Sequence, residues 1–203
     1  MDALQAWDEA LLLTLNGHPD WLHPTAWVLT SKWAAAPVVL LILFRLFKGG
    51  IRRSAWIALA AFLVTFAGTD AISSRLMKPG FERLRPSHED RLSDALTLHQ
   101  FEDGSIYRGG RFGFVSSHAA NTFGLATLAV LMFGAGAWRW LWLWALLVSW
   151  TRIYLGVHYP GDILFGALFG AGWAAACLTL FRKIDTRIPV SYTHLRAHET
   201  NSN

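Results

Sequence analysis

The sequence contains one cysteine in 203 residues, Cys177, so no disulfide can form within the chain. Charged residues are also scarce, at 16% of the chain, whereas apolar residues make up 53%. The first ten residues, MDALQAWDEA, are acidic and lack the positively charged start of a cleavable signal peptide. These shortages exclude a disulfide framework and indicate that the apolar segments themselves direct any insertion into a membrane.

Apolar residues do not alternate with polar ones but occur in long blocks, and a helix needs about 20 such residues to cross a bilayer. The blocks are 25–47, 54–77, 119–133, 138–155 and 163–181. The first contains Lys32 and Pro37, which favour a shorter span from Trp33 after an interfacial turn. The sequence therefore predicts an all-α integral membrane bundle of about five transmembrane helices.

Both ends of the chain differ from these blocks. Residues 3–15 place Leu4, Trp7 and Leu11 at helical spacing, which predicts a short interfacial helix on the membrane surface. Residues 190–203, VSYTHLRAHETNSN, are polar and resemble translated adapter sequence, so we expect a non-native or disordered tail. We therefore expect residues 1–189 to form a single domain.

The distribution of basic residues predicts the orientation of the chain. In a membrane protein this distribution matters more than the net charge of +4, which therefore implies no nucleic-acid partner. The loop 45–53 contains Arg45, Lys48, Arg52 and Arg53 and no acidic residue, so it should be cytoplasmic, whereas the loop 78–115 mixes both signs of charge. The N-terminus and the charged end of the fourth block should then lie outside.

The stretch 151–162, TRIYLGVHYPGD, places three ionisable side chains at one end of an apolar block. Pro160 suits the first position of a helix, so His158 would lie just before this helix and Asp162 in its first turn. The aspartate could then fix one ring nitrogen of the histidine, and Arg152 offers donors suited to a phosphate. The alternative is an interfacial histidine beside a helix-capping aspartate.

Two more clusters fall on the same predicted side. Lys78 and Arg85 follow the second block, and VSSH at 115–118 begins the third. A helix that begins near Ser116 directs free N–H groups and the positive end of its dipole outward, which favours an anion. The sequence shows no carboxylate cluster for a metal ion. The three clusters together predict a phosphate site that contains His118 and His158.

These motifs resemble those of the type 2 phosphatidic acid phosphatase superfamily. Lys78, Arg85 and Pro86 match the first motif completely. The second motif of the family is PSGH, and residues 115–118 (VSSH) have Val115 in place of its proline and Ser117 in place of its glycine. The third motif begins with Thr151 in place of serine and is otherwise matched by Arg152, His158 and Asp162.

The resemblance implies a residue-by-residue mechanism without a metal or cofactor. His158 would attack phosphorus and form a phosphohistidine, Asp162 would orient it, and His118 would protonate the leaving oxygen. The phosphate would be held by Lys78, Arg85, Ser116, Ser117 and Arg152. Arg83 lies outside the pattern and is expected on the surface or paired with Glu82.

The chain is thus expected to be a membrane lipid phosphatase at the outer face of a bacterial cytoplasmic membrane. Its substrate would be a phosphorylated lipid in the bilayer, and VSSH followed by AANTF looks most like the undecaprenyl diphosphate phosphatase branch. The alternatives are a lipid phosphotransferase, a phosphatase for phosphatidic acid or phosphatidylglycerol phosphate, and a phospholipid binder or transporter without turnover.

Overall fold

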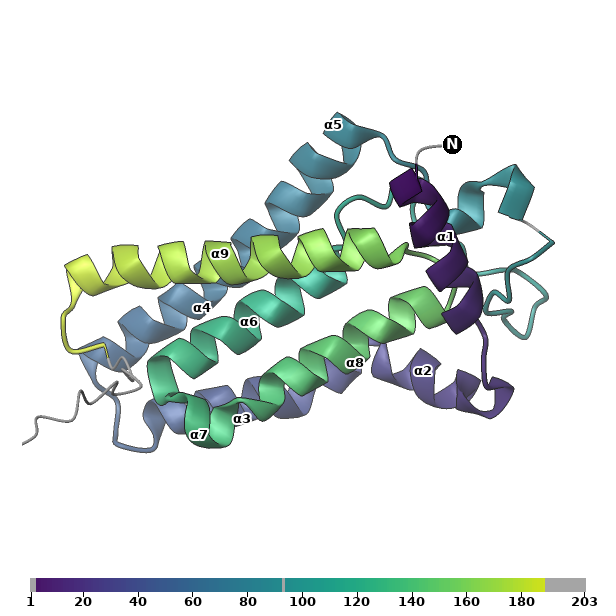
Figure 1. Cartoon of the computed structure of the whole chain (residues 1–203). Coiled ribbons are helices and arrows are strands. Elements are labelled where there is room, and N and C mark those ends of the chain that lie inside the picture. Colours follow the sequence, from purple (N-terminus) through teal and green to yellow (C-terminus); the bar gives the residue numbers. More distant parts are fainter. Residues whose placement is uncertain (1–2, 93, 189–203) are drawn as a thin grey trace, which may run out of the picture.

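The computed structural model describes residues 3–92 and 94–188, and all regular elements in these ranges are helices. Figure 1 shows α4, α6, α8 and α9 running lengthwise through the molecule, with α1 and α2 at one end. The α-helices are α1 (Ala3–Leu15), α2 (His23–Leu29), α3 (Ala36–Phe47), α4 (Arg53–Ile72), α5 (Lys78–Phe81), α6 (Ser117–Phe133), α7 (Ala135–Trp138), α8 (Trp140–Tyr154) and α9 (Pro160–Ile184). The predicted all-α fold and the helix over residues 3–15 are confirmed, while the predicted tail 190–203 lies outside the described residues.

Two helical stretches in the described residues are each long and apolar enough to cross a membrane, and a third candidate is a bent pair. The continuous helical stretches Arg53–Phe81 and Pro160–Ile184 have 29 and 25 residues, and Asp20–Leu29 with Lys32–Phe47 qualify only jointly, across a 65° bend. The helices of the third and fourth apolar blocks, α6 and α8, have 17 and 15 residues. At 1.5 Å per residue they are about 26 and 23 Å long, which is shorter than the roughly 30 Å of hydrocarbon in a bilayer. The membrane bundle is confirmed, whereas the number of five spans stays a prediction.

The bend in the first apolar block is located between α2 and α3. Ser31 adopts an extended conformation, and a 3-10 turn, Lys32–Ala35, leads into α3. Pro37 occupies the first turn of α3, where its missing N–H breaks no helical hydrogen bond. The structure thus has a bend where the interfacial turn was expected, and the α-helix that follows begins at Ala36 rather than at Trp33, whereas a shorter span from this point stays a prediction.

A π-helical turn, Ser73–Met77, joins α4 to α5 and lies directly before Lys78. Pro79 follows at the start of α5, where it cannot donate a backbone hydrogen bond and its ring crowds the preceding turn. A widened π turn relieves such crowding, and these turns are frequent at functional sites. The local sequence thus explains the irregular end of this helix.

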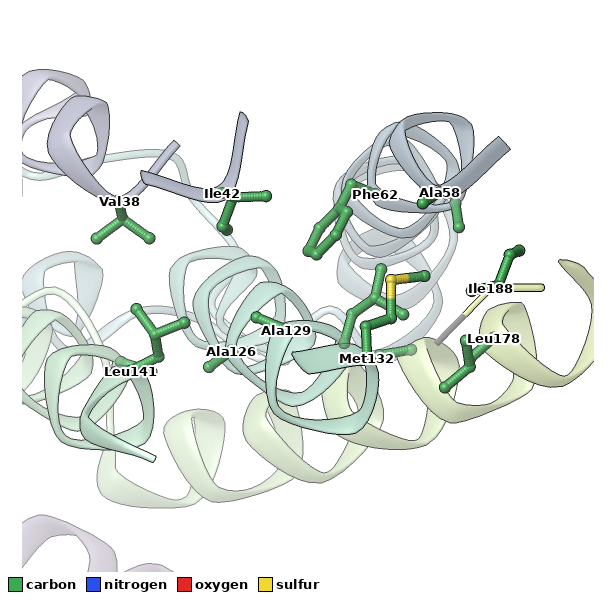
Figure 2. Close-up of a cluster of buried hydrophobic side chains, with 14 residues drawn as sticks. Val38, Ile42, Ala58, Phe62, Ala126, Ala129, Met132, Leu141, Leu178 and Ile188 are labelled. Carbon is green, nitrogen blue, oxygen red and sulfur yellow. The ribbon is translucent and has the colours of Figure 1, made fainter. Parts of the chain in front are cut away.

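The hydrophobic core lies between the helices that run lengthwise through the molecule. Figure 2 shows this cluster of buried side chains, which includes Val38 and Ile42 of α3, Phe62 of α4, Met132 of α6 and Leu178 of α9. The contact between α6 and α9 is instead made by small residues, so the two helix backbones lie close together. This close approach fixes the start of α6 against the start of α9, where the motif residues lie.

Replacing Gly170 by alanine should destabilise the α6 and α9 pair. A Cβ at this position would lie 2.1 Å from the carbonyl oxygen of Ala120, so the helices would have to separate. We expect Gly170→Ala to cost about 1–3 kcal/mol, the usual range for overpacking. Gly172→Ala is the matched control, because a Cβ there meets nothing within 4 Å. Thermal unfolding in detergent measures the difference, and equal melting temperatures would contradict this packing.

Candidate active site

The predicted pair of His158 and Asp162 is formed at the start of α9. Pro160 is the first residue of the helix, as expected, and the carboxylate of Asp162 turns back toward the preceding residues. Its Oδ2 accepts hydrogen bonds from His158 Nδ1 at 3.1 Å and from the Tyr159 N–H at 3.2 Å. This contact places the proton on Nδ1 and leaves Nε2 of His158 with a free lone pair.

The surroundings of His158 favour its neutral form. Its side chain is 1% exposed, and burial together with the charges of Arg85 and Arg152 holds the pKa of His158 well below its ordinary value. The imidazole is therefore unprotonated at neutral pH, which a nucleophile requires. The structure thus provides at position 158 a buried, oriented and uncharged histidine.

The first and second motifs meet at Ser117, the first residue of α6. Lys78 Nζ donates to Ser117 Oγ at 2.6 Å, and Ser73 Oγ donates to the same oxygen at 2.8 Å. Ser116 caps the helix with its side chain, and its N–H donates to the carbonyl oxygen of Asp162 at 3.0 Å. The hydroxyl that replaces the glycine of the family motif is therefore a direct partner of the motif lysine.

The motif arginines are both buried, with exposed fractions of 8% for Arg85 and 2% for Arg152. Arg85 Nε donates to the carbonyl oxygen of Phe112 at 3.1 Å, while Arg152 donates to Thr30 Oγ1 at 2.6 Å and to the Tyr107 hydroxyl at 2.9 Å. Among the described residues, Arg152 Nε has no hydrogen-bond partner, and neither guanidinium pairs with a carboxylate. Buried charges without a counterion are costly, so this arrangement favours a bound anion.

The charges of the site act on one another. Burial and the neighbouring Arg152 lower the pKa of Arg85 to about 10, so its guanidinium stays charged at neutral pH. His118 lies in the first turn of α6, where the charges of Arg152, Arg85 and Lys78 act on it. The structure therefore brings the three predicted clusters together at one end of α6, α8 and α9.

A metal site would need several ligating side chains close together. Within residues 3–92 and 94–188, no group of three or more His, Cys, Asp or Glu side chains is arranged for this. The cations and helix-start N–H groups instead offer their donors to an anion. That the reaction needs no metal stays a prediction.

The prediction for Arg83 is wrong. Its guanidinium contacts Asp162 Oδ1 at 2.8 Å and Asp8 Oδ2 at 2.5 Å, rather than lying on the surface or pairing with Glu82. Arg83 stands two residues before Arg85, so an extended chain would direct both side chains to the same face. That spacing was the available signal for Arg83, whereas nothing local in the sequence indicates Asp8.

The loop between α5 and α6 contributes to the site. Tyr107 from this loop binds Arg152, and its backbone N–H donates to the carbonyl oxygen of His99 at 2.8 Å. Thr30, at the bend after α2, binds the other terminal nitrogen of Arg152. Neither residue is near a motif in the sequence, so sequence reasoning missed both.

Comparison with known proteins agrees with these motifs. The model of the PAP2 superfamily matches residues 54–185. A Lipid A 4'-phosphatase of Bacteroides thetaiotaomicron is 36% identical over 195 residues, which cover 90% of this chain and 83% of the relative. A Lipid A 4'-phosphatase of Porphyromonas gingivalis is 34% identical over 164 residues, which cover 79% and 66% of the two chains.

Two solved structures have a similar fold. The PAP2 type phosphatidylglycerolphosphate phosphatase of Bacillus subtilis matches with a TM-score of 0.62 at 22% identity, over 91% of this chain and 89% of that one. LpxE of Aquifex aeolicus matches with a TM-score of 0.55 at 25% identity, over 84% and 93% of the two chains. The predicted family and the predicted enzyme class are thereby confirmed: this chain belongs to the PAP2 superfamily and is a membrane phosphatase of that type.

Proposed function

We propose that this protein is a membrane lipid phosphatase that removes a phosphate group from a phosphorylated glycolipid of the lipid A class. The observation that carries the proposed chemistry is the buried hydrogen bond between His158 and Asp162, beside two buried arginines, Arg85 and Arg152, that pair with no carboxylate among the described residues. A neutral nucleophile next to unpaired cations suits attack on a phosphate ester.

The reaction proceeds in two steps. Nε2 of His158 attacks phosphorus, the bond from phosphorus to the ester oxygen breaks, and His118 gives its proton to the departing lipid oxygen. Water then attacks phosphorus and gives a proton to His118, the bond from phosphorus to Nε2 of His158 breaks, and inorganic phosphate leaves. The non-bridging oxygens are held by Lys78, Arg85, Arg152, Ser116 and Ser117, which stabilise the charge of the transition state.

The proposed lipid rests on the relatives. Both curated relatives are named Lipid A 4'-phosphatase, and the first aligns with 90% of this chain. The expected undecaprenyl diphosphate gains no support from these comparisons, and it becomes the rival substrate. The match to the phosphatidylglycerolphosphate phosphatase, at 22% identity, supports the fold alone.

The proposed location is the extracytoplasmic face of the inner membrane of a bacterium. Arg45, Lys48 and Arg52 border one pocket together with Arg187, which follows α9. Figure 1 shows the loop before α4 and the end of α9 together, at the opposite end of the molecule from α1 and α5. The positive-inside rule assigns that basic end to the cytoplasm, and the active site then faces outside.

A substrate panel tests this proposal. Purified protein in detergent with EDTA is given a phosphorylated lipid A, undecaprenyl diphosphate, phosphatidic acid and phosphatidylglycerol phosphate, and released phosphate is measured. We expect the highest kcat/KM for the glycolipid, no loss in EDTA, and inhibition by vanadate, which copies five-coordinate phosphorus. Preference for another lipid would overturn the assigned substrate, and phosphate found on an added acceptor lipid instead of in solution would identify a phosphotransferase.

A further inference from the structure

A closed ring of hydrogen bonds connects the surface helix α1 to the His158–Asp162 pair. Arg83 donates from one nitrogen to Asp162 Oδ1 at 2.8 Å and from the other to Asp8 Oδ2 at 2.5 Å. The second oxygen of Asp8 accepts from the N–H of Gly161 at 2.7 Å, next to Asp162 in the first turn of α9. The ring therefore starts and ends at α9 and passes through α1.

The ring controls the one oxygen of Asp162 that His158 does not use. Asp162 is completely buried, with Oδ2 occupied by His158 and the Tyr159 N–H, so Oδ1 depends on Arg83 for its charged partner. A planar guanidinium that binds two carboxylates has a fixed orientation, whereas one that binds a single carboxylate can rotate. Asp8 thus determines how Arg83 presents its donor to Asp162.

Packing alone does not fix Arg83. Its side chain is 28% exposed and borders a cavity of about 740 Å³ between α1 and α9, although its guanidinium lies 4.2 Å from the ring of Tyr159. Asp8 is 13% exposed and approaches α9 so closely that a Cβ at Gly161 would lie 2.8 Å from its Oδ2. The ion pair, rather than surrounding side chains, holds Arg83 on its cavity side.

We propose that Asp8 and Arg83 are positioning residues of the phosphatase: Asp8 fixes Arg83, Arg83 fixes Asp162, and Asp162 aligns His158 for attack. The surface helix α1 is then part of the catalytic apparatus as well as a membrane contact. This inference rests on the roles of His158 and Asp162 in the proposed function. It predicts that disruption of the ring slows the chemical step without weakening substrate binding.

The test measures kcat, KM and melting temperature in detergent for Asp8→Asn, Arg83→Gln and the double variant. We expect each single variant to lower kcat by about 10- to 100-fold, the usual effect of losing a group that orients another. KM should change little, because none of these atoms holds the phosphate. The double variant should be no slower than Arg83→Gln, because both changes break one chain of contacts. Asp8→Asn keeps the shape of the side chain and tests the proposal even where Arg83→Gln fails to fold.

A second ion pair of α1 provides the matched control. Arg91 binds Glu9 of α1, with 2.5 Å between Arg91 Nη1 and Glu9 Oε2, and this pair is not a member of the ring through Asp8, Arg83 and Asp162. Glu9→Gln and Arg91→Gln should leave kcat within about threefold, the scale of a partly exposed ion pair. Equal losses from both pairs, or a double variant whose loss is the product of the single losses, would overturn the proposal.

His158→Ala in the same assay separates a failure of the proposed function from a failure of the positioning role. Activity in His158→Ala would refute the proposed roles of His158 and Asp162, and with them this inference. An inactive His158→Ala beside a fully active Asp8→Asn would refute the positioning role alone.

Discussion

His158→Ala should lower kcat for phosphate release by about 10⁴-fold or more, as expected when a covalent nucleophile is removed. No neighbouring group can replace it, because Nε2 of this histidine is the unprotonated nitrogen held in place by Asp162. Phosphate release from the preferred lipid in detergent measures the effect, and the melting temperature verifies that the variant is folded.

His18→Ala is the matched control for this experiment. Its side chain is 72% exposed and its ion-pair partner is Asp20, so its removal should leave kcat unchanged. Near-normal release by a folded His158→Ala protein would refute the assignment of the nucleophile.

His118→Ala should lower kcat by about 10²- to 10⁴-fold for a lipid monoester, the usual contribution of a general acid or base. The loss should depend on the leaving group, because an acid matters most when the departing oxygen is strongly basic. A p-nitrophenyl phosphate substrate has a weakly basic leaving group and should show a much smaller loss in its first step. The comparison of the two substrates separates proton donation from a general disturbance of the site.

Stopped-flow detection of p-nitrophenol isolates this first step from later hydrolysis of the phosphohistidine. Equal losses for both substrates would contradict the role of His118 as the acid. Normal turnover of the lipid by His118→Ala would contradict any role in the reaction.

The sequence was sufficient for those parts of the site whose geometry is local. His158 and Asp162 are four residues apart on either side of a helix start, so Pro160 alone predicted that the carboxylate turns back to the imidazole. In the same way, Ser116 and Ser117 were predicted at the start of a helix, and they lie there. These predictions succeeded because one turn of helix determines the relevant distances.

Contacts that depend on how distant segments pack could not be predicted. Arg152 binds Thr30 and Tyr107, which are 122 and 45 residues away in the sequence. The contact of Arg83 with Asp8 spans 75 residues. The break after α2 was indicated by Lys32 and Pro37, but its angle of 65° was not. Hydrophobic blocks predict helices and spans, but not which polar groups meet at their ends.

The contacts of Ser117, which replaces the glycine of the second family motif, are also evident only from the structure. From the resemblance to the family, Ser117 was expected to help hold the phosphate. The structure adds a hydroxyl that binds Lys78 and Ser73, so this chain connects the lysine to the start of α6 through a side chain. The family motif alone could not indicate this contact.

Trapping the phosphohistidine shows whether His158 accepts the phosphoryl group of the lipid. Lipid substrate labelled with ³²P in the reacting phosphate is mixed with enzyme, quenched in alkali within the first turnover, and the protein is examined for bound label. We expect label that is stable in alkali, lost in acid and located on the peptide that contains His158, with none on His158→Ala. Turnover without any labelled wild-type protein, or equal labelling of His158→Ala, would contradict this role of His158.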